Sequence, residues 1–273
     1  MSPLPDFADE AKRVMDAAEE RKVVLRLFGG VSFLLRCPSA KHRSLQRSYL
    51  DLDFMGYSRQ SKDIIRLFKE LGYVPREIFN AWQGYKRLIF NDIGNKRRVD
   101  VFLDVFEMCH KFDMKKRLEI DRYTIPLADM LATKLQIREI NEKDMKDILS
   151  LLTDYDIGET DSGLINGAYI AKLCSDDWGV YKTFTLNLDA ILASLPERDL
   201  ESEQMEVVSA RTKRLREAIE LAPKSLRWNL RAKVGERMRW YELPEPDQEL
   251  VDSRISKENS NGAAKANDRS DKE

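Results

Sequence analysis

The fold is decided by residues 23–32, which have the sequence VVLRLFGGVS. The mainly apolar residues 23–28 predict a strand, and the apolar residues 31–36 predict a helix that opens directly after Gly29 and Gly30. Glycine lets the backbone approach a phosphate closely, and a helix N-terminus offers free N–H groups and the positive end of a dipole. The stretch therefore predicts a strand–turn–helix unit that is able to bind a phosphate.

The same turn also fits an ordinary connection between a strand and a helix. Ser32 adds a hydroxyl donor nearby. However, the turn lacks the Gly-Lys-Ser/Thr of a Walker A loop and the GxGxxG of a dinucleotide-binding fingerprint. On its own it leaves both interpretations open, and the residues that follow it along the chain decide between them.

Two aspartates occupy the next predicted strand, residues 49–55. The period of two places Asp51 and Asp53 on one face, opposite the apolar residues Leu50, Leu52 and Phe54. Two carboxylates about 7 Å apart on one face repel each other, and a divalent cation removes that repulsion. The pair therefore predicts a magnesium site, and the alternative is the solvated face of an edge strand.

A later predicted strand, residues 97–106, carries further carboxylates. Its apolar face is formed by Val99, Val101, Leu103 and Val105. Asp100 and Asp104 point to the other face, so Asp100 completes a three-carboxylate cluster if this strand lies beside the first. Asp104 lies further along the strand, and we therefore prefer Asp100. A solvated face is again the alternative.

The pattern as a whole predicts an α+β fold, in which a small mixed β-sheet with flanking helices over residues 1–125 precedes a mainly α-helical domain over residues 126–240. The helices predicted for the first part are residues 7–22, 31–36 and 61–71, and its strands are residues 23–28, 49–55, 85–91 and 97–106, with a turn at 91–95. The helices predicted for the second part are residues 127–140, 142–152, 162–195 and 203–240. Residues 241–273 hold few apolar side chains and predict a disordered tail.

Composition excludes several classes of protein. The formal net charge of −1 gives no global attraction to nucleic acid or to a membrane. Three widely spaced cysteines and two histidines argue against a disulfide framework and against a zinc site. No apolar run approaches the roughly 20 residues that a membrane span requires, and the N-terminus does not resemble a signal peptide. We therefore expect a cytoplasmic protein.

The order of these motifs resembles the nucleotidyltransferase superfamily related to DNA polymerase β. A strand, a Gly-Gly turn and a helix are followed by an Asp-x-Asp strand and then by a lone aspartate on a later strand. Within it, FGGVS at 28–32, HRS at 42–44 and DLDF at 51–54 resemble the AbiEii/AbiGii-type toxin branch. Here residues 45–50 separate HRS from the aspartates, which is a departure from that pattern.

The helical half resembles the same branch. DMLATKLQ at 129–136, followed by KDMKDI at 143–148, is similar to the branch's Lys-Leu-x-Ala and Asp-x-x-Asp signatures. The resemblance, which covers about residues 23–155, implies that Lys134 neutralises charge on a triphosphate. It makes Arg138, Asp144 and Asp147 candidates for positioning Lys134, with Arg138 expected one turn along the same helix face. The alternative is an ordinary amphipathic helix pair with surface ion pairs.

The activity implied by the resemblance is the metal-dependent transfer of an NMP from an NTP to an acceptor. Asp51, Asp53 and Asp100 would bind two Mg²⁺ ions, with Mn²⁺ as a substitute, and Asp100 would help to deprotonate the acceptor hydroxyl. Gly29, Gly30 and Ser32 would bind the NTP phosphates. Two alternatives stay open: a glycosyltransferase, whose Asp-x-Asp motif also holds a metal, and a non-catalytic nucleotide- or RNA-binding module on the same fold.

The acceptor is predicted from the C-terminal helices. Ten Lys or Arg residues stand among residues 211–240, and Trp228 and Trp240 are interleaved with them. A basic helical surface with exposed aromatic rings suits the phosphate backbone of RNA, and a solvated helix face is the alternative. Toxins of the resembled branch act on tRNA, so we expect tRNA or a protein as acceptor, and an antitoxin protein as a partner.

Overall fold

The computed structural model describes residues 2–243 of the chain. Met1–Tyr241 form one compact unit, and the second unit begins at Glu242. Almost all of the predicted disordered tail, residues 241–273, lies outside the described residues. The predicted division near residue 125 stays a prediction. None of the helices among residues 2–243 combines the length and the apolar character that a membrane span requires.

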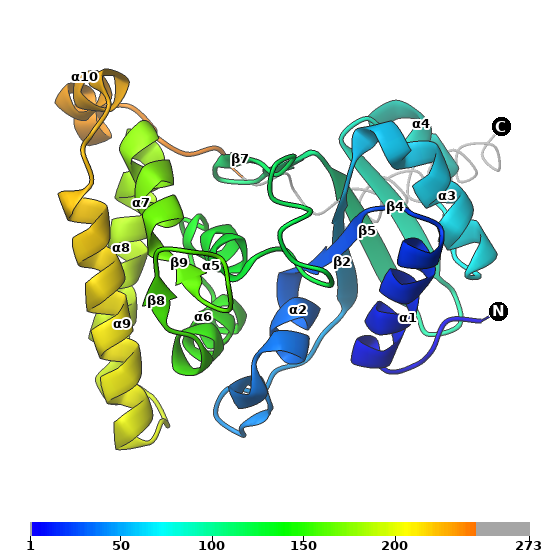
Figure 1. The fold of residues 1–273 in the computed structure, drawn as a ribbon, viewed down its shortest axis with the longest axis horizontal. Coiled ribbons are helices and arrows are strands. Elements are labelled where there is room, and N and C mark those ends of the chain that lie inside the picture. Colours follow the sequence, from blue (N-terminus) through cyan, green and yellow to red (C-terminus); the bar gives the residue numbers. More distant parts are fainter. Residues whose placement is uncertain (1, 244–273) are drawn as a thin grey trace, which may run out of the picture. The chain divides into compact units, whose positions relative to one another are not determined.

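A mixed five-stranded sheet forms the centre of the first half of the chain, in the order β1-β2-β5-β4-β3 (Figure 1). The strands are β1 (Leu25–Phe28), β2 (Asp51–Gly56), β3 (Val74–Pro75), β4 (Arg87–Asp92) and β5 (Arg97–Leu103). β2 and β5 are parallel, and the other neighbours in the sheet are antiparallel. Together with the mainly helical second half, this sheet confirms the predicted α+β class.

Four helices accompany the sheet: α1 (Phe7–Glu20), α2 (Gly29–Arg36), α3 (Ser61–Glu70) and α4 (Glu77–Gln83). α1 and α3 cover one face, where their apolar residues pack on the alternate residues of β2, β4 and β5 that the period of two turns toward them (Figure 1). Phe68 of α3 stacks on Phe90 of β4 with ring centroids 4.4 Å apart. Burying each such ring contributes about 1.5–3 kcal/mol. The aspartates of β2 are thereby left on the opposite face.

The second half of the chain is built from α5 (Leu127–Leu135), α6 (Glu142–Asp154), α7 (Gly167–Asp176), α8 (Trp178–Ser194), α9 (Ser202–Leu221) and α10 (Leu226–Val234). Of two short strand pairs, β6 (Val105–Glu107) with β7 (Lys111–Asp113) precedes α5 in sequence, and β8 (Ile157–Gly158) with β9 (Ile165–Asn166) lies between α6 and α7. Phe33 of α2 and Met55 of β2 belong to the same apolar core as α5 to α9. The helical half is therefore continuous with the sheet face that carries the aspartates.

Several predicted elements were too long. The helix predicted for residues 127–140 ends at Leu135, and the one predicted for 203–240 is interrupted after Leu221, where Pro223 follows. Within the helix predicted for 162–195, residues 165–166 instead form strand β9. Residues 167–194 form two helices, because the chain is extended at Asp177, whose side chain caps α8 by accepting from Gly179 N at 2.7 Å. These boundaries depend on tertiary packing and on caps that the apolar period does not contain.

Other elements were missed or shifted. α4 and the two-residue strand β3 were not predicted, and α2 begins at Gly29 rather than at Val31. The strand predicted for 97–106 ends at Leu103, because Asp104 has a φ of +62° and breaks the ladder before β6. The sheet and the main helices were nevertheless predicted in the right order.

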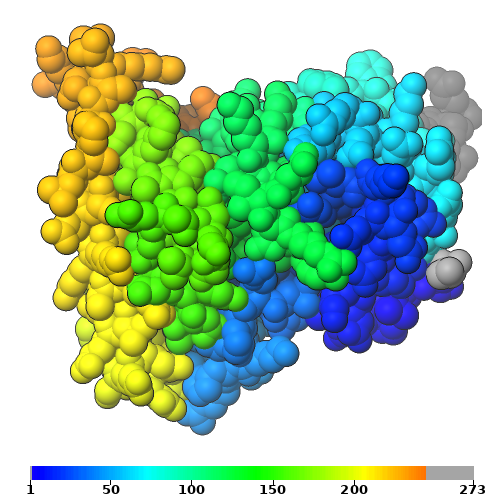
Figure 2. Space-filling view, in the orientation of Figure 1, coloured from blue at the N-terminus to red at the C-terminus, as the bar shows by residue number. Residues whose placement is uncertain are grey.

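The segment of residues 114–126 joins the two halves. Residues 123–125 run beside β1, where Leu27 donates to Tyr123 O at 2.9 Å and Ile125 donates to Leu27 O at 3.1 Å. An ion pair between Arg36 and Asp121 at 2.8 Å ties the same segment to α2. Figure 2 shows this segment, in green, lying between the blue N-terminal helix and the lime-coloured helices of the second half.

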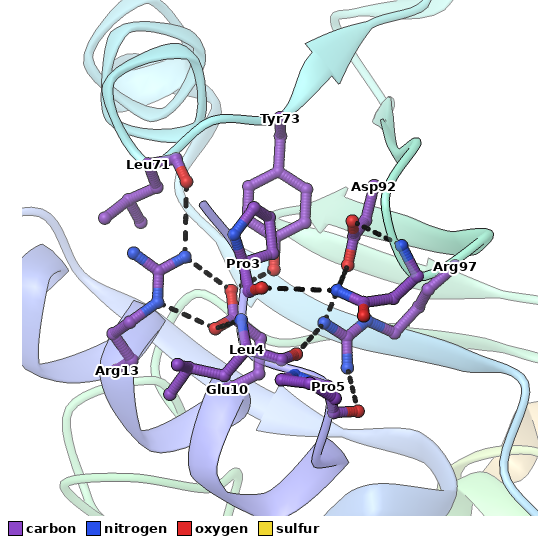
Figure 3. Close-up of polar contacts among 10 residues, drawn as sticks. Pro3, Leu4, Pro5, Glu10, Arg13, Leu71, Tyr73, Asp92 and Arg97 are labelled. Atoms are coloured by element: carbon purple, nitrogen blue, oxygen red, sulfur yellow. Dashed lines mark hydrogen bonds and ion pairs between the residues drawn. The ribbon is translucent and has the colours of Figure 1, made fainter. Parts of the chain in front are cut away.

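A buried charged network attaches the N-terminal residues to the sheet (Figure 3). This N-terminal network consists of Glu10, Arg13, Tyr73, Asp92 and Arg97. Glu10 accepts from Arg13 Nε and Nη2, each at 2.7 Å, and from the Tyr73 hydroxyl. Arg97 Nη2 donates to Asp92 Oδ2 at 2.8 Å and to Leu4 O at 2.7 Å. Each buried carboxylate thus has a guanidinium partner.

Candidate active site

β2 and β5 are direct neighbours, which places the predicted carboxylates together. In their parallel register Asp53 lies opposite Asp100, and Asp51 lies opposite Arg98. Asp100 is buried, Asp53 is partly buried, and Asp51 is exposed. Asp104, the rival to Asp100, lies beyond the end of β5, where it accepts from Ser58 N at 3.1 Å and from Ser58 Oγ at 2.5 Å. We define Asp51, Asp53 and Asp100 as the acidic cluster.

Burial and charge repulsion both raise pKa values within the acidic cluster. Desolvation by the surrounding protein, together with the charges of Asp51 and Asp100, raises the pKa of Asp53 well above its usual range. Desolvation and the charge of Asp100 likewise raise the pKa of Asp51. No side chain among residues 2–243 forms a hydrogen bond or an ion pair with Asp51 or Asp53. Asp53, the more buried of the two, thus lacks within this part of the chain the partner that a buried charge normally has.

Asp100 has such partners. Arg87 of β4 places Nε 2.8 Å from Asp100 Oδ1, and Arg98 of β5 places Nε 2.8 Å from Asp100 Oδ2. The guanidinium of Arg87 also lies 4.6 Å from the centroid of the Phe102 ring. Both oxygens of Asp100 are therefore engaged by arginines in this structure.

The Gly-Gly turn lies directly against the acidic cluster. Gly29 has a φ of +64°, and a Cβ at this position would lie 2.1 Å from Asp53 Oδ2. Only glycine fits both the left-handed backbone and the close approach of the carboxylate. The Ser32 hydroxyl, which is predicted to bind phosphate, is buried and donates to Gly29 O at 2.7 Å. Its proton is therefore directed into the first turn of α2.

Lys134 of α5 points toward α2, where its Nζ lies 5.6 Å from the ring centroid of Phe33. Its Nζ is 2.7 Å from Asp144 Oδ1 and 2.9 Å from Asp147 Oδ2, so both predicted aspartates contact it. Burial opposes the charge of Lys134, but the two carboxylates outweigh this effect and raise the pKa of the ammonium group. The charge of Lys134 opposes the rise in the pKa of Asp53 but does not offset it. The buried ion pairs exclude the alternative of an exposed surface pair for Lys134.

Arg138 does not accompany Lys134. α5 ends at Leu135, so Arg138 is not on the same helix face, and that prediction was wrong. The guanidinium of Arg138 lies 5.7 Å from the ring centroid of Trp240. No contact between Arg138 and Lys134 supports the predicted role of Arg138 in positioning Lys134.

Arg47 is a residue of this region that the sequence analysis missed. Its Nε and Nη2 donate to the two oxygens of Asp147 at 2.7 and 2.8 Å. The motif resemblance instead pointed to His42 and Arg43, which are exposed; His42 bonds Ser44, and Arg43 pairs with Asp199 at 3.2 Å. One signal was present, because extending the period of two back from Asp53 places residues 47, 49 and 51 on the same face.

The residues present fit a divalent cation. Among residues 2–243, no group of three or more His, Cys, Asp or Glu side chains is already assembled closely enough to hold a metal ion. The chemistry of the donors is nevertheless that of a Mg²⁺ site, since carboxylate oxygens on neighbouring strands repel one another, and no cationic side chain among residues 2–243 forms an ion pair with Asp51 or Asp53. Because Arg87 and Arg98 hold the two oxygens of Asp100, this carboxylate is not free to join Asp51 and Asp53 in binding a cation.

The predicted acceptor surface differs from its expected form. Trp228 and Trp240 are half-buried rather than exposed: Trp228 packs edge-on to Tyr181 with centroids 5.1 Å apart, and Trp240 Nε1 donates to Thr183 Oγ1 at 3.1 Å. Arg211 Nη1 donates to the carbonyls of residues 152 and 153, at 2.9 and 2.7 Å. Part of the basic segment therefore has a structural role, and the aromatic rings are not available for stacking as they stand.

Comparison with known proteins gives distant structural likeness only. No protein-family model matches the chain, and no curated protein matches its sequence. The lincosamide antibiotic adenylyltransferase LnuA in its lincomycin-bound form is similar at a TM-score of 0.41 and 16% identity, over 54% of this chain and 98% of that one. The antibiotic-resistance factor ANT(2'')-Ia is similar at a TM-score of 0.37 and 11% identity, over 60% and 90%.

A third solved structure covers more of this chain. The STING-associated CdnE c-di-GMP synthase from Capnocytophaga granulosa is similar at a TM-score of 0.26 and 10% identity, over 82% of this chain and 80% of that one. Identities this low leave the chemistry of this chain to be judged from its own side chains.

Proposed function

We propose that this chain is a Mg²⁺-dependent nucleotidyltransferase that transfers an NMP from an NTP to an acceptor hydroxyl. The observation that carries the proposal is the placement of the acidic cluster against the Gly-Gly turn. Asp53 lies opposite Asp100 in the sheet and touches the backbone at Gly29, where α2 presents its N-terminal N–H groups. Carboxylates for a metal ion and donors for a phosphate thus meet at one point.

The side chains divide the chemistry between them. Asp51, Asp53 and Asp100 would hold Mg²⁺, which when bound would stabilise charge on the attacking and leaving oxygens. The N–H groups of the first turn of α2 would bind the phosphates, and Lys134 would neutralise charge on the departing pyrophosphate. Asp100 would accept the proton of the acceptor hydroxyl once Arg87 or Arg98 releases one of its oxygens.

Labelling with each of the four α-³²P NTPs tests this proposal. The wild type, incubated with Mg²⁺ or Mn²⁺ and either total RNA or total cellular protein, should release pyrophosphate and transfer label to one of the two. The D51A variant should transfer none. Absence of pyrophosphate release with every NTP, metal and acceptor would exclude the proposal.

A toxin role is the biological form of this proposal. It rests on the resemblance of the motifs at residues 28–32 and 51–54 to the AbiEii/AbiGii-type branch, with tRNA or a protein as acceptor and an antitoxin as partner. Expression of the wild type should then arrest growth, whereas expression of the D51A variant should not. Growth that is unaffected by the wild type would remove the toxin role and leave the enzymatic proposal standing.

One observation favours a second candidate, a non-catalytic binding module. Both oxygens of Asp100 are engaged by Arg87 and Arg98, which is how a structural carboxylate is held. A module of this kind predicts that the D51A and D100A variants keep the biological effect of the wild type. The glycosyltransferase alternative requires a larger sheet and no phosphate-binding turn, so the five-stranded sheet and Gly29 count against it.

A further inference from the structure

We propose that Arg47 is a second cation that contacts the triphosphate, alongside Lys134. This inference rests on the proposed function and adds a residue to the same site. Arg47 comes from the irregular segment before β2, yet its side chain is only 11% exposed and lies between α2 and α6. A buried guanidinium at this place calls for an explanation, because arginine is rarely buried unless it is paired.

The guanidinium is held in a fixed position. Asp147 of α6 accepts from its Nε and Nη2, and the Tyr49 ring lies beneath it with the centroid 4.6 Å from Cζ. Nη1 donates to Ser48 O at 3.0 Å. Among the described residues these bonds use three of the five N–H groups of an arginine, and one N–H remains on each terminal nitrogen. The side chain is thus oriented by protein contacts while it retains donors for a ligand.

Gly30 shows where these donors lie. A Cβ at Gly30 would lie 1.8 Å from Arg47 Nη2, so the guanidinium occupies the space that any other residue would fill with its side chain. The two glycines therefore have different partners, since Asp53 packs against Gly29 and Arg47 packs against Gly30. The cation and the acidic cluster approach the first turn of α2 from separate directions. A phosphate bound at that turn would lie within reach of both.

Lys134 and Arg47 share one carboxylate oxygen. Asp147 Oδ2 is 2.9 Å from Lys134 Nζ and 2.8 Å from Arg47 Nη2, so the two cations lie side by side. Asp144 and Asp147 balance their two charges, which allows both cations to stay buried without a ligand. A guanidinium suits phosphate because its planar donors bind two oxygens at once, whereas an ammonium acts as a point charge. The pair therefore forms a site for adjacent phosphate groups.

The test is a binding comparison between a triphosphate and a monophosphate. We would titrate the α,β-methylene analogues of ATP, GTP, CTP and UTP, and the four NMPs, into the wild type in Mg²⁺, followed by calorimetry. Loss of one charged hydrogen-bonding partner should weaken binding of the triphosphate analogue in the R47A variant roughly tenfold to a hundredfold. Binding of the matching NMP should stay within about twofold, since it lacks the β- and γ-phosphates that Arg47 would contact.

Arg43 provides the matched control. It lies in the same segment, but its side chain is 80% exposed and, among the described residues, pairs only with Asp199, so the R43A variant should bind both ligands as the wild type does. The R47Q variant, which keeps a donor for Asp147 without the charge, replaces R47A if that variant does not fold. A merely structural role would lower stability and reduce binding of both ligands equally.

The outcomes separate the two proposals. Unchanged triphosphate binding in R47A or R47Q, or an equal loss for triphosphate and monophosphate, overturns the role of Arg47 and leaves the proposed function standing. If the wild type binds none of the four triphosphate analogues, the proposed function fails and the role of Arg47 fails with it.

Discussion

The N-terminal network and the acidic cluster both place charged groups against the same sheet. The charges of the network are paired, whereas the carboxylates of β2 in the acidic cluster are not. In the network, Glu10 is paired with Arg13 and Asp92 with Arg97. Two of its nitrogens, Arg13 Nη1 and Arg97 Nε, have no hydrogen-bond partner among the described residues, so charge is balanced even though not every donor is satisfied. In the acidic cluster, Asp53 lies near two other carboxylates, and no cationic side chain of the described residues forms an ion pair with it.

Under the proposed function, the N-terminal network is a structural site and the acidic cluster is a functional one. Balanced buried pairs hold two parts of a chain together, and breaking one leaves an uncompensated charge. Repelling carboxylates reduce stability in the absence of a ligand, and such perturbed groups gather at functional sites. The first region should therefore respond to mutation with lost stability, and the second with lost activity.

The largest expected effect is on catalysis. The D53N variant keeps the size of the side chain but removes the charge that a metal ion requires, so transfer of label should fall at least about a thousandfold. The midpoint of thermal unfolding should stay unchanged or rise, because one of three repelling carboxylates is gone. Measured kcat/KM and melting temperature together check this. A variant that loses stability and activity in parallel would make Asp53 structural.

The next effect is on stability. The D92A variant leaves Arg97 buried without its partner and should lose about 3–5 kcal/mol of unfolding free energy. Urea denaturation measures this, and activity per folded molecule should stay within about twofold of the wild type. The exposed pair of Arg122 with Glu19 is the control, since its R122A variant should unfold at the wild-type urea concentration. A stable D92A variant would contradict the comparison.

A third buried polar group, His110, extends the comparison because it is buried in its neutral form. Burial lowers the pKa of His110 to about 4, although Asp177 acts in the opposite direction, and His110 Nε2 bonds Thr183 Oγ1 at 2.8 Å. In the unfolded chain a histidine protonates near pH 6.5, so the unfolded state takes up a proton first as the pH falls. Stability should therefore decline from about pH 6.5 to pH 4, by up to roughly 3 kcal/mol.

The H110N variant isolates this decline. It removes the titrating group and should show a flatter dependence of unfolding free energy on pH across that window, as measured by urea denaturation at several pH values. An identical pH dependence in wild type and variant would mean that His110 is not the buried neutral group that the structure describes.

The smallest effect is expected at Arg138, which belongs to neither region. It lies beyond α5 and contacts the Trp240 ring, so the R138A variant should lose no more than about 1 kcal/mol of stability. Its kcat/KM should stay within about twofold of the wild type, because no contact links Arg138 to Lys134. A large loss of activity would restore the role that motif resemblance gave to Arg138.

Local periodicity was enough to predict the faces of the two central strands. The alternation in β2 and β5 placed Asp51, Asp53 and Asp100 opposite the apolar core, and the structure has them on one face. That β2 and β5 are neighbours was only a condition of the prediction, because strand pairing is a tertiary property that no short pattern contains. The arginines on Asp100 follow from that pairing and could not be foreseen.

The position of Arg47 and the ends of the helices could not be predicted from periodicity. Arg47 lies before β2 in a segment for which neither a strand nor a helix was predicted, and its partner Asp147 lies 100 residues away. The ends of α5 and α9 depend on where the helices pack. The apolar period continues past Leu135, and for this reason the helix predicted for residues 127–140 was too long. Sequence patterns located the three carboxylates of the acidic cluster, whereas contacts between distant segments decide how Lys134 and Arg47 are held.

The most direct test of the central claim is the effect of Mg²⁺ on binding of the α,β-methylene NTP analogues, measured by calorimetry on the wild type and on D53N. The repulsion at Asp53 predicts that the wild type binds an analogue tightly only with Mg²⁺ present, and that D53N loses this dependence on Mg²⁺. Binding that is equally tight in D53N, or that is independent of Mg²⁺ in the wild type, would contradict the acidic cluster as a metal–nucleotide site.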